Sequence, residues 1–197
     1  MTAPRVKITT EPVLDPILTA DVATHLRIGT TEATAESAYI TALIAAARQT
    51  IERVYLHRTL IDTTYQMDLD GFEDVIKLPS PPLSSVTSVK YYDSDNALQT
   101  LDAAYYEVDT TSEPGRIIRA SDYDWPDTYD RTASVQIAYI CGYGDEATDV
   151  PQAIRHALLM YVGMLYENRE TITELKLEEV PMAVKSLLGA YCAKGLY

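Results

Sequence analysis

The chain has 197 residues, enough for one domain or for one domain with a sizeable insertion. Hydrophobic residues make up 47% of it, which argues against wholesale disorder. Asp and Glu number 29 against 16 Lys and Arg, and the resulting formal net charge of −13 repels nucleic acids and anionic membranes at long range.

The two cysteines, Cys141 and Cys192, lie far apart and form no CxxC motif. They indicate neither a disulfide framework nor a zinc site, and they favour folding in a reducing cytoplasm. The first residues lack the apolar core of a signal peptide, and the most apolar stretch, Ala157 to Tyr166, is shorter than the roughly 20 residues that span a bilayer. We therefore expect a soluble chain that is not exported and has no membrane partner.

The first third of the chain predicts an arm followed by two helices. Residues 1–15 show no hydrophobic periodicity, and we expect an N-terminal arm there rather than a helix or strand. Thr19 can cap a short helix that Gly29 ends. The clearest helix covers 39–55, where apolar residues at steps of three and four form one stripe: Ile40, Leu43, Ile44, Ala47, Ile51, Val54 and Tyr55. Arg48 and Glu52 lie four residues apart on its flank and can pair.

From about residue 63 to residue 143 the hydrophobic period changes from helical to extended. Short β-branched or aromatic segments are separated by turn clusters, at 64–69, 86–92, 105–108, 116–119 and 135–140. This pattern predicts a small antiparallel β-domain of five or six strands. Helix returns at Pro151, and a further helix begins at Pro181.

Three amphipathic stripes cannot each be buried alone, so we expect the terminal helices to pack together. The predicted fold class is α+β, a helical bundle built from N- and C-terminal helices with an inserted small antiparallel β-domain. The expected boundaries are the arm at 1–15, the bundle at 16–60 and 150–192, the inserted β-domain at 61–149 and a C-terminal tail at 193–197.

The sequence carries no recognisable catalytic motif. GxSxG, GxGxxG and phosphate-loop patterns are absent. His25, His57 and His156 have no neighbouring ligand at metal-binding spacing in the sequence. We therefore predict no catalytic residue, no metal and no cofactor.

An acidic, aromatic stretch at 121–130 is the one cluster that looks like a site. Its carboxylates could ligate calcium, but the glycine and glutamate of an EF-hand loop are missing. Two other interpretations remain open: a solvated loop with Trp125 tucked onto the sheet, or a partner-binding loop. The residues of the predicted partner-binding loop are Asp122, Asp124, Trp125, Asp127 and Tyr129.

Two further features favour contacts between proteins. Fifteen tyrosines accompany one Phe and one Trp, and tyrosine suits surfaces that assemble after folding. A charged linker at 174–179 precedes an apolar segment that extends from Pro181 to the last residue. That segment is a third bundle helix with a frayed tail, or a mobile peptide that docks in a groove of another protein. Both can hold if the helix packs in the bundle and the tail reaches out.

Several short motifs, taken in order, resemble one family of proteins. They are Leu26-Arg27-Ile28, Ala46-Ala47-Arg48, Pro79 to Leu83, Gly142-Tyr143-Gly144, Val150-Pro151 and Arg169-Glu170. In this order they resemble the head–tail connector (adaptor) proteins of tailed bacteriophages and phage-like gene transfer agents. The longer acidic loop at 121–130 departs from that family's pattern.

The resemblance implies a structural virion protein and no enzyme. It implies a ring of about twelve copies beneath the portal, located in the neck of the particle and assembled in the host cytoplasm, through which DNA passes without sequence-specific binding. The portal protein and a tail or stopper protein would be its partners. The C-terminal segment would dock on the portal through Val180, Pro181, Val184, Leu187, Leu188, Tyr191, Leu196 and Tyr197.

Within such a ring, charged helix residues are the first to consider for contacts between subunits. We name Arg48, Glu52, Arg169 and Glu170 for intersubunit pairing. The alternative is that they are solvated helix charges, and exposed ion pairs contribute little to stability.

Two other function classes are compatible with parts of the sequence. An acidic DNA-mimicking inhibitor, or another protein-binding module, would use the negative charge to occupy a basic groove, although the carboxylates here concentrate in loops. A metal enzyme would use the acidic loop, but it lacks any His–carboxylate constellation. The acidity itself serves solubility or keeps passing DNA from adhering, and net charge does not separate the two.

Overall fold

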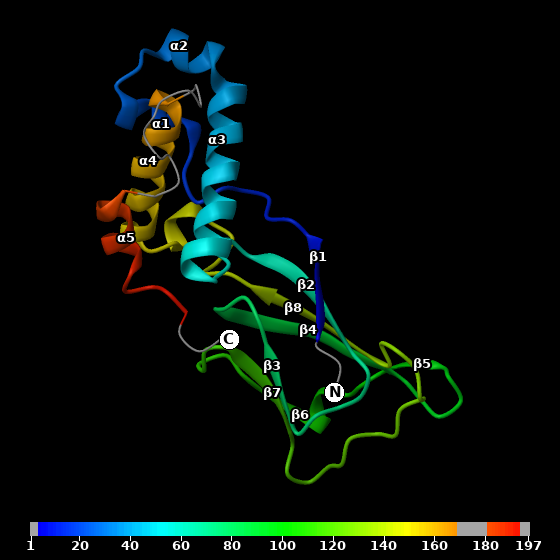
Figure 1. Ribbon diagram of the computed structural model, residues 1–197. Helices are drawn as coiled ribbons and strands as arrows, with labels where there is room; N and C mark the ends of the chain where they lie inside the picture. Colours follow the sequence, from blue (N-terminus) through cyan, green and yellow to red (C-terminus); the bar gives the residue numbers. More distant parts are fainter. Residues whose placement is uncertain (1–3, 169–180, 194–197) are drawn as a thin grey trace. The chain divides into compact units, whose positions relative to one another are not determined.

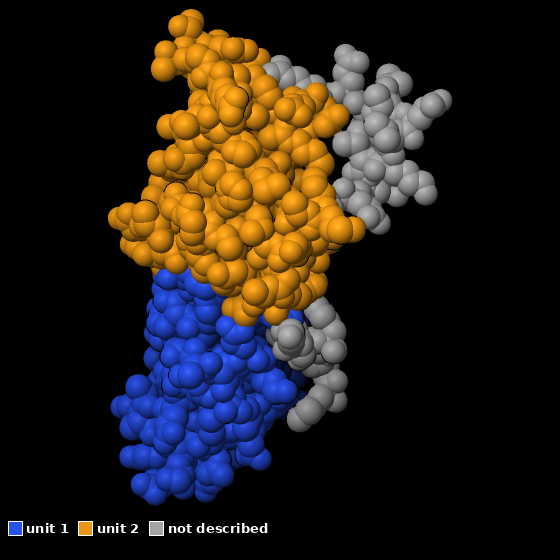
Figure 2. Space-filling view, turned by 90° about the vertical axis from the view of Figure 1, so that its left-hand side faces the viewer, with its two compact units in different colours: residues 1–12, 62–143, 193–197 blue, residues 13–61, 144–192 orange. Residues whose placement is uncertain are grey.

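A computed structural model describes residues 4–168 and 181–193 of the chain (Figure 1). It combines helices with antiparallel sheets, so the predicted α+β class is confirmed. The chain divides into two compact units, coloured separately in Figure 2. The β unit comprises residues 1–12, 62–143 and 193–197, and the helical unit comprises residues 13–61 and 144–192.

The helical unit contains α1 (Thr19–Leu26), α2 (Thr30–Ala35), α3 (Ser37–Thr50), α4 (Gln152–Glu167) and α5 (Met182–Leu188). A π-helical turn, Ile51–Leu56, continues α3, and a 3₁₀ turn, Ala147–Asp149, precedes α4. Helix α4 contacts α1, α3 and α5 (Figure 1). It buries Ile154, Leu158 and Val162 along one face. Helices from the two ends of the sequence therefore share one core, as their apolar stripes require.

The π-helical turn changes which residues of the predicted stripe are buried. Ile40, Ile44, Ala47 and Ile51 are buried as expected, but Val54 is 60% exposed and Leu56 is buried instead. A π-helix bonds each residue to the fifth along and so needs more residues per turn than an α-helix. Steps of three and four therefore no longer follow one face after residue 51.

The first helices also differ from the prediction in where they end. Arg27, not Gly29, ends α1: it adopts the left-handed conformation with φ of 58°, and the N–H of Ile28 bonds the carbonyl of Ala23 at 3.2 Å. Gly29 is instead the N-cap residue of α2, a helix that the sequence analysis missed. Because α2 buries none of its residues, it has no apolar stripe to reveal it.

The β unit contains two antiparallel sheets. The larger one has the strand order β1-β2-β8-β4-β5 within the described residues, and the smaller one has the order β3-β7-β6. The strands are β1 (Arg5–Thr10), β2 (Thr63–Leu69), β3 (Val75–Leu78), β4 (Leu83–Tyr92), β5 (Leu98–Thr100), β6 (Tyr106–Asp109), β7 (Gly115–Arg119) and β8 (Val135–Cys141).

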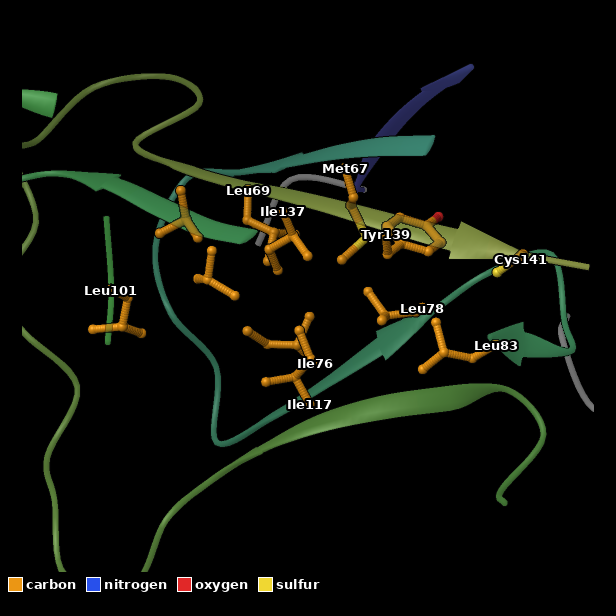
Figure 3. Close-up of a cluster of buried hydrophobic side chains, with 12 residues drawn as sticks. Met67, Leu69, Ile76, Leu78, Leu83, Leu101, Ile117, Ile137, Tyr139 and Cys141 are labelled. Atoms are coloured by element: carbon orange, nitrogen blue, oxygen red, sulfur yellow. The ribbon is translucent and has the colours of Figure 1, made fainter. Parts of the chain in front are cut away.

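Side chains from both sheets meet in one apolar core (Figure 3). Strand β8 lies at the centre of the larger sheet and pairs with β2 and β4 along its length. Its alternate residues Val135, Ile137, Tyr139 and Cys141 are buried. Ile76 and Leu78 of β3 and Ile117 of β7 fill the same core from the smaller sheet (Figure 3).

Strand β1 corrects the prediction of an N-terminal arm. Residues 5–10 pair antiparallel with β2, with Val6 opposite Met67 and Ile8 opposite Tyr65. The alternation of Val6 and Ile8 with polar residues was a usable strand signal. Strands β3 and β5 were also missed, because four and three residues are too few to establish a period.

The chain requires glycine at position 142, where it leaves the last strand of the β unit. Gly142 has φ of 152°, and a Cβ atom there would lie 2.5 Å from the backbone nitrogen of Asp62. Thr63 pairs with Cys141 directly beside this contact. Both strain and a clash with backbone therefore oppose any other residue.

We predict that Gly142→Ala lowers the free energy of unfolding by about 2–3 kcal/mol, because it combines an unfavourable φ with a backbone clash. Gly71→Ala is the matched control: no atom lies within 4 Å of the added methyl group. It should change stability by less than about 0.5 kcal/mol. Urea unfolding of the two variants measures both, and equal stabilities would contradict the role of Gly142.

Candidate assembly surfaces

Arg48 forms the most buried ion pair described in the helical unit. Its Nε donates to Asp15 Oδ1 at 2.8 Å, and a terminal guanidinium nitrogen donates to Glu52 Oε2 at 3.3 Å. The other oxygen of Glu52 accepts the backbone N–H of Leu60 at 2.9 Å. The Arg48 guanidinium thus connects the segment before α1 to the π-helical turn, and the Glu52 carboxylate extends the link to the segment after that turn.

The surroundings of this cluster bear on its expected role. The side chains of Arg48 and Glu52 are only 11% and 13% exposed. The pairing of the two residues, expected from their spacing, is present. They lie inside the helical unit with partners in their own chain, whereas Arg169 and Glu170, the other residues named for intersubunit pairing, lie outside the described residues.

Burial dominates the electrostatics of Glu52. Loss of water raises the pKa of its carboxyl above the ordinary 4.5, although the Leu60 N–H and the Arg48 guanidinium act in the opposite direction. The cluster is therefore held together by hydrogen bonds and charge at a cost in desolvation.

Part of the segment predicted to dock on the portal forms helix α5, which packs within the helical unit. Val184 and Leu188 are buried, and α5 contacts α4. Pro181, Leu187 and Tyr191 are half-buried, and the guanidinium of Arg58 donates to the carbonyl oxygen of Tyr191. The remaining residues named for docking, Val180, Leu196 and Tyr197, lie outside the described residues.

The acidic loop is attached to the β unit through its tryptophan. Trp125 stacks on Phe72 with ring centroids 4.6 Å apart and planes 6° from parallel, and its indole N–H donates to the carbonyl of Glu73 at 3.0 Å. The other residues of the predicted partner-binding loop are exposed: Asp122, Asp124, Asp127 and Tyr129. The loop therefore presents carboxylates and a tyrosine to solvent from an anchored indole ring.

The structure brings together two histidines that the sequence analysis considered separately. His25 of α1 and His156 of α4 pack edge to face with ring centroids 6.3 Å apart. Across residues 4–168 and 181–193, no group of three His, Cys, Asp or Glu side chains is placed to hold a metal ion. In the same ranges, no helix combines the length and the hydropathy needed to cross a membrane.

Comparison with known proteins identifies where this fold occurs. No protein-family model matches the sequence, and a search of curated proteins finds no match either. Among solved structures, the chain matches one in the neck of an empty gene transfer agent (GTA) particle, computed with C6 symmetry, at a TM-score of 0.80 and 21% identity. The match covers 98% of this chain and 97% of that chain. The chain has the fold of a GTA neck protein.

Two further GTA structures give the same result. A chain in the virion of a native GTA particle matches at a TM-score of 0.72 with 20% identity, covering 98% of this chain and 97% of that one. A chain in the native GTA neck, computed with C12 symmetry, matches at 0.63 with 18% identity, covering 96% and 98%. The predicted resemblance to connector proteins is thus confirmed at the level of the fold, and it extends over both units.

We predict that Arg48→Leu lowers the free energy of unfolding by about 3 kcal/mol, because two carboxylates lose their shared cation in a buried place. Arg5→Leu is the matched control, since the Arg5–Asp70 pair of 2.6 Å is exposed. It should cost less than about 1 kcal/mol. Chemical denaturation distinguishes the two, and similar losses would contradict the structural role of Arg48.

A second prediction concerns pH. A raised pKa means that folded Glu52 holds its proton more tightly than unfolded Glu52, so stability falls as pH rises from about 4.5 through the folded pKa. Glu52→Gln, which cannot ionise, should remove this decline when unfolding is measured from about pH 4 to pH 7. Glu32→Gln, at an exposed site on α2, controls for the loss of one carboxylate. A wild-type stability that rises with pH relative to Glu52→Gln would contradict the prediction.

Proposed function

We propose that this chain is a structural virion protein, a ring-forming head–tail adaptor in the neck of a phage-like particle. The observation that carries the proposal is the match of nearly its whole length to a chain in the GTA neck at a TM-score of 0.80. The match includes both units and therefore reflects a shared fold rather than one shared local motif. The proposed role is to dock on the portal and continue the DNA channel towards the tail, without catalysis.

A ring of about twelve copies fits the proposal. The neck structures that share this fold were computed with C6 and C12 symmetry. Closed rings form when one surface of a subunit meets a different surface of the next, and each subunit repeats that contact. The virion neck is accordingly the proposed location of this chain.

The charge of the chain suits a DNA conduit. A net charge of −13 opposes binding of phosphate groups, and the exposed aspartates of the acidic loop add to that repulsion. DNA could then pass the ring without adhering to it. The exposed carboxylates and Tyr129 of the loop are proposed as contacts for a tail or stopper protein.

The proposed portal contact is the C-terminal segment. Because Val184 and Leu188 are buried in the helical unit, α5 can serve as an anchor and leave the apolar residues that follow it for docking. Leu196 and Tyr197 are therefore the residues to test first. Apolar side chains at the end of an anchored segment are suited to a groove in a partner.

We expect this protein, mixed with the portal protein encoded in the same gene cluster, to form a complex containing many copies of the chain. Light scattering of each protein alone and of the mixture measures the mass. A protein that stays monomeric and does not bind the portal would contradict the adaptor role. It would favour the alternative function, an acidic inhibitor of a nucleic-acid enzyme.

We also expect the double substitution Leu196→Ser and Tyr197→Ser to weaken portal binding at least about tenfold, the equivalent of roughly 1.4 kcal/mol. Lys194→Ser is the matched control, since it alters the same segment without removing an apolar side chain. Both variants should keep the unfolding midpoint of the wild type. Unchanged portal affinity in the double variant would exclude this docking segment.

A further inference from the structure

Strand β1 leaves an open, apolar edge on the larger sheet. It is the first strand in the sheet order, with β2 on one side and no strand on the other within the described residues. Val6 is 39% exposed and Ile8 is 36% exposed. An edge of this kind presents unpaired N–H and C=O groups to any strand that can reach it.

The two apolar residues of β1 extend the core face of the sheet. Val6 lies opposite Met67 and Ile8 opposite Tyr65 on β2, and these partners lie opposite Ile137 and Tyr139 on β8. Met67, Ile137 and Tyr139 are fully buried, whereas the row ends in exposed side chains at β1. An added strand would continue the ladder and lie beside the exposed side chains of Val6 and Ile8.

The opposite edge of the same sheet has a complementary character. Among the described residues, strand β5 pairs with β4 alone. All three of its residues are exposed, and Leu98 is 49% exposed. It lies between carboxylates: Asp93 and Asp95 precede it in the hairpin turn, and Asp102 follows it. Asp93 and Asp102 are fixed by hydrogen bonds to backbone N–H groups of Ala97 and Ala104, both at 2.9 Å.

The charges at the two edges select between possible partners. Strand β1 carries the exposed Lys7 and no carboxylate, and its Arg5 is paired with Asp70 of the same chain. Lysine on an edge strand disfavours pairing with an identical strand, because like charges would then face each other. A strand flanked by carboxylates would instead attract the ammonium group of Lys7.

We propose that β1 of one copy pairs with β5 of the next copy, so that the larger sheet continues from subunit to subunit. The inference rests on the proposed ring, which requires two different complementary surfaces on one chain. Both edges belong to the β unit, with the exposed Lys7 on β1 and the carboxylates of Asp93, Asp95 and Asp102 flanking β5. The partner strand for the β1 edge is therefore β5 of a second copy of the same chain.

The strand directions allow this pairing in a ring. Every neighbouring pair in the sheet is antiparallel, so β1 and β5, four steps apart in the strand order, run in the same direction. Adjacent copies in a ring with many members differ by a small rotation. Strand β1 of one copy would then meet β5 of the next in parallel.

Cysteine cross-linking tests the contact. Lys7, Leu98 and Thr100 share the sheet face opposite the core, according to the register. In a Cys192→Ala background, the pairs Lys7→Cys with Thr100→Cys and Lys7→Cys with Leu98→Cys cover two registers. Four strand spacings of about 4.8 Å separate these positions within one chain, too far for an internal disulfide.

The full-length variants are assembled on the portal protein, oxidised, and run on a non-reducing gel. We expect a ladder of covalent multimers, several-fold stronger than for the control pair Lys7→Cys with Thr87→Cys, because Thr87 is exposed on the interior strand β4. Light scattering before oxidation reports assembly separately.

The outcomes separate the two proposals. A ladder from either edge pair supports the continuous sheet. Portal-bound complexes of full mass with no more multimer than the control would overturn the edge contact and leave the adaptor role standing. Variants that fold but never assemble, together with a wild type that behaves likewise, would overturn both.

Discussion

The fold depends on a close backbone approach between Asp62 and Gly142. The chain enters the β unit at Asp62 and leaves it after Tyr143, so entry and exit must lie side by side. Only a residue without a Cβ atom permits that approach. The pairing of Thr63 with Cys141 begins next to it, and from there β2 and β8 run together to the far end of the sheet. An insertion held in this way closes the interrupted helical unit with little loop entropy.

A different interaction organises the helical unit. The Arg48 guanidinium at the end of α3 binds Asp15 before α1 and Glu52 in the π-helical turn, and Glu52 in turn binds Leu60 after that turn. The end of α3 belongs to an apolar stripe, whereas the segments before α1 and after the π-helical turn are too short to define an apolar period. Hydrophobic contact is not directional, whereas a buried charge must meet its two carboxylate partners, because an unpaired charge in that position would be costly. The ion pairs therefore fix the relative positions of these segments. Arg48 and Glu52 therefore hold segments of their own chain together.

The sequence predicted those helices and strands that carry a hydrophobic period within their own residues. The stripe of α3 and the alternation of β8 each repeat often enough to define a period, and both elements lie where the pattern places them. Helix α2 has no stripe, and β5 is too short for one. The burial of Val184 and Leu188 could be anticipated as helix packing, but the sequence could not decide between packing and docking. Contacts such as Trp125 on Phe72, 53 residues apart in the chain, depend on topology and are not encoded in any local pattern.

The distribution of the β unit along the chain limits how such a protein can evolve. Its residues come from three separate stretches: 1–12, 62–143 and the segment from residue 193. A genetic exchange that replaced only the central stretch would leave β1 facing a foreign neighbour in place of β2. Mosaic recombination, which exchanges whole blocks of sequence, would therefore have to transfer the N-terminal codons together with the middle of the gene. The two units alternate along the sequence, so neither can be exchanged as one continuous block.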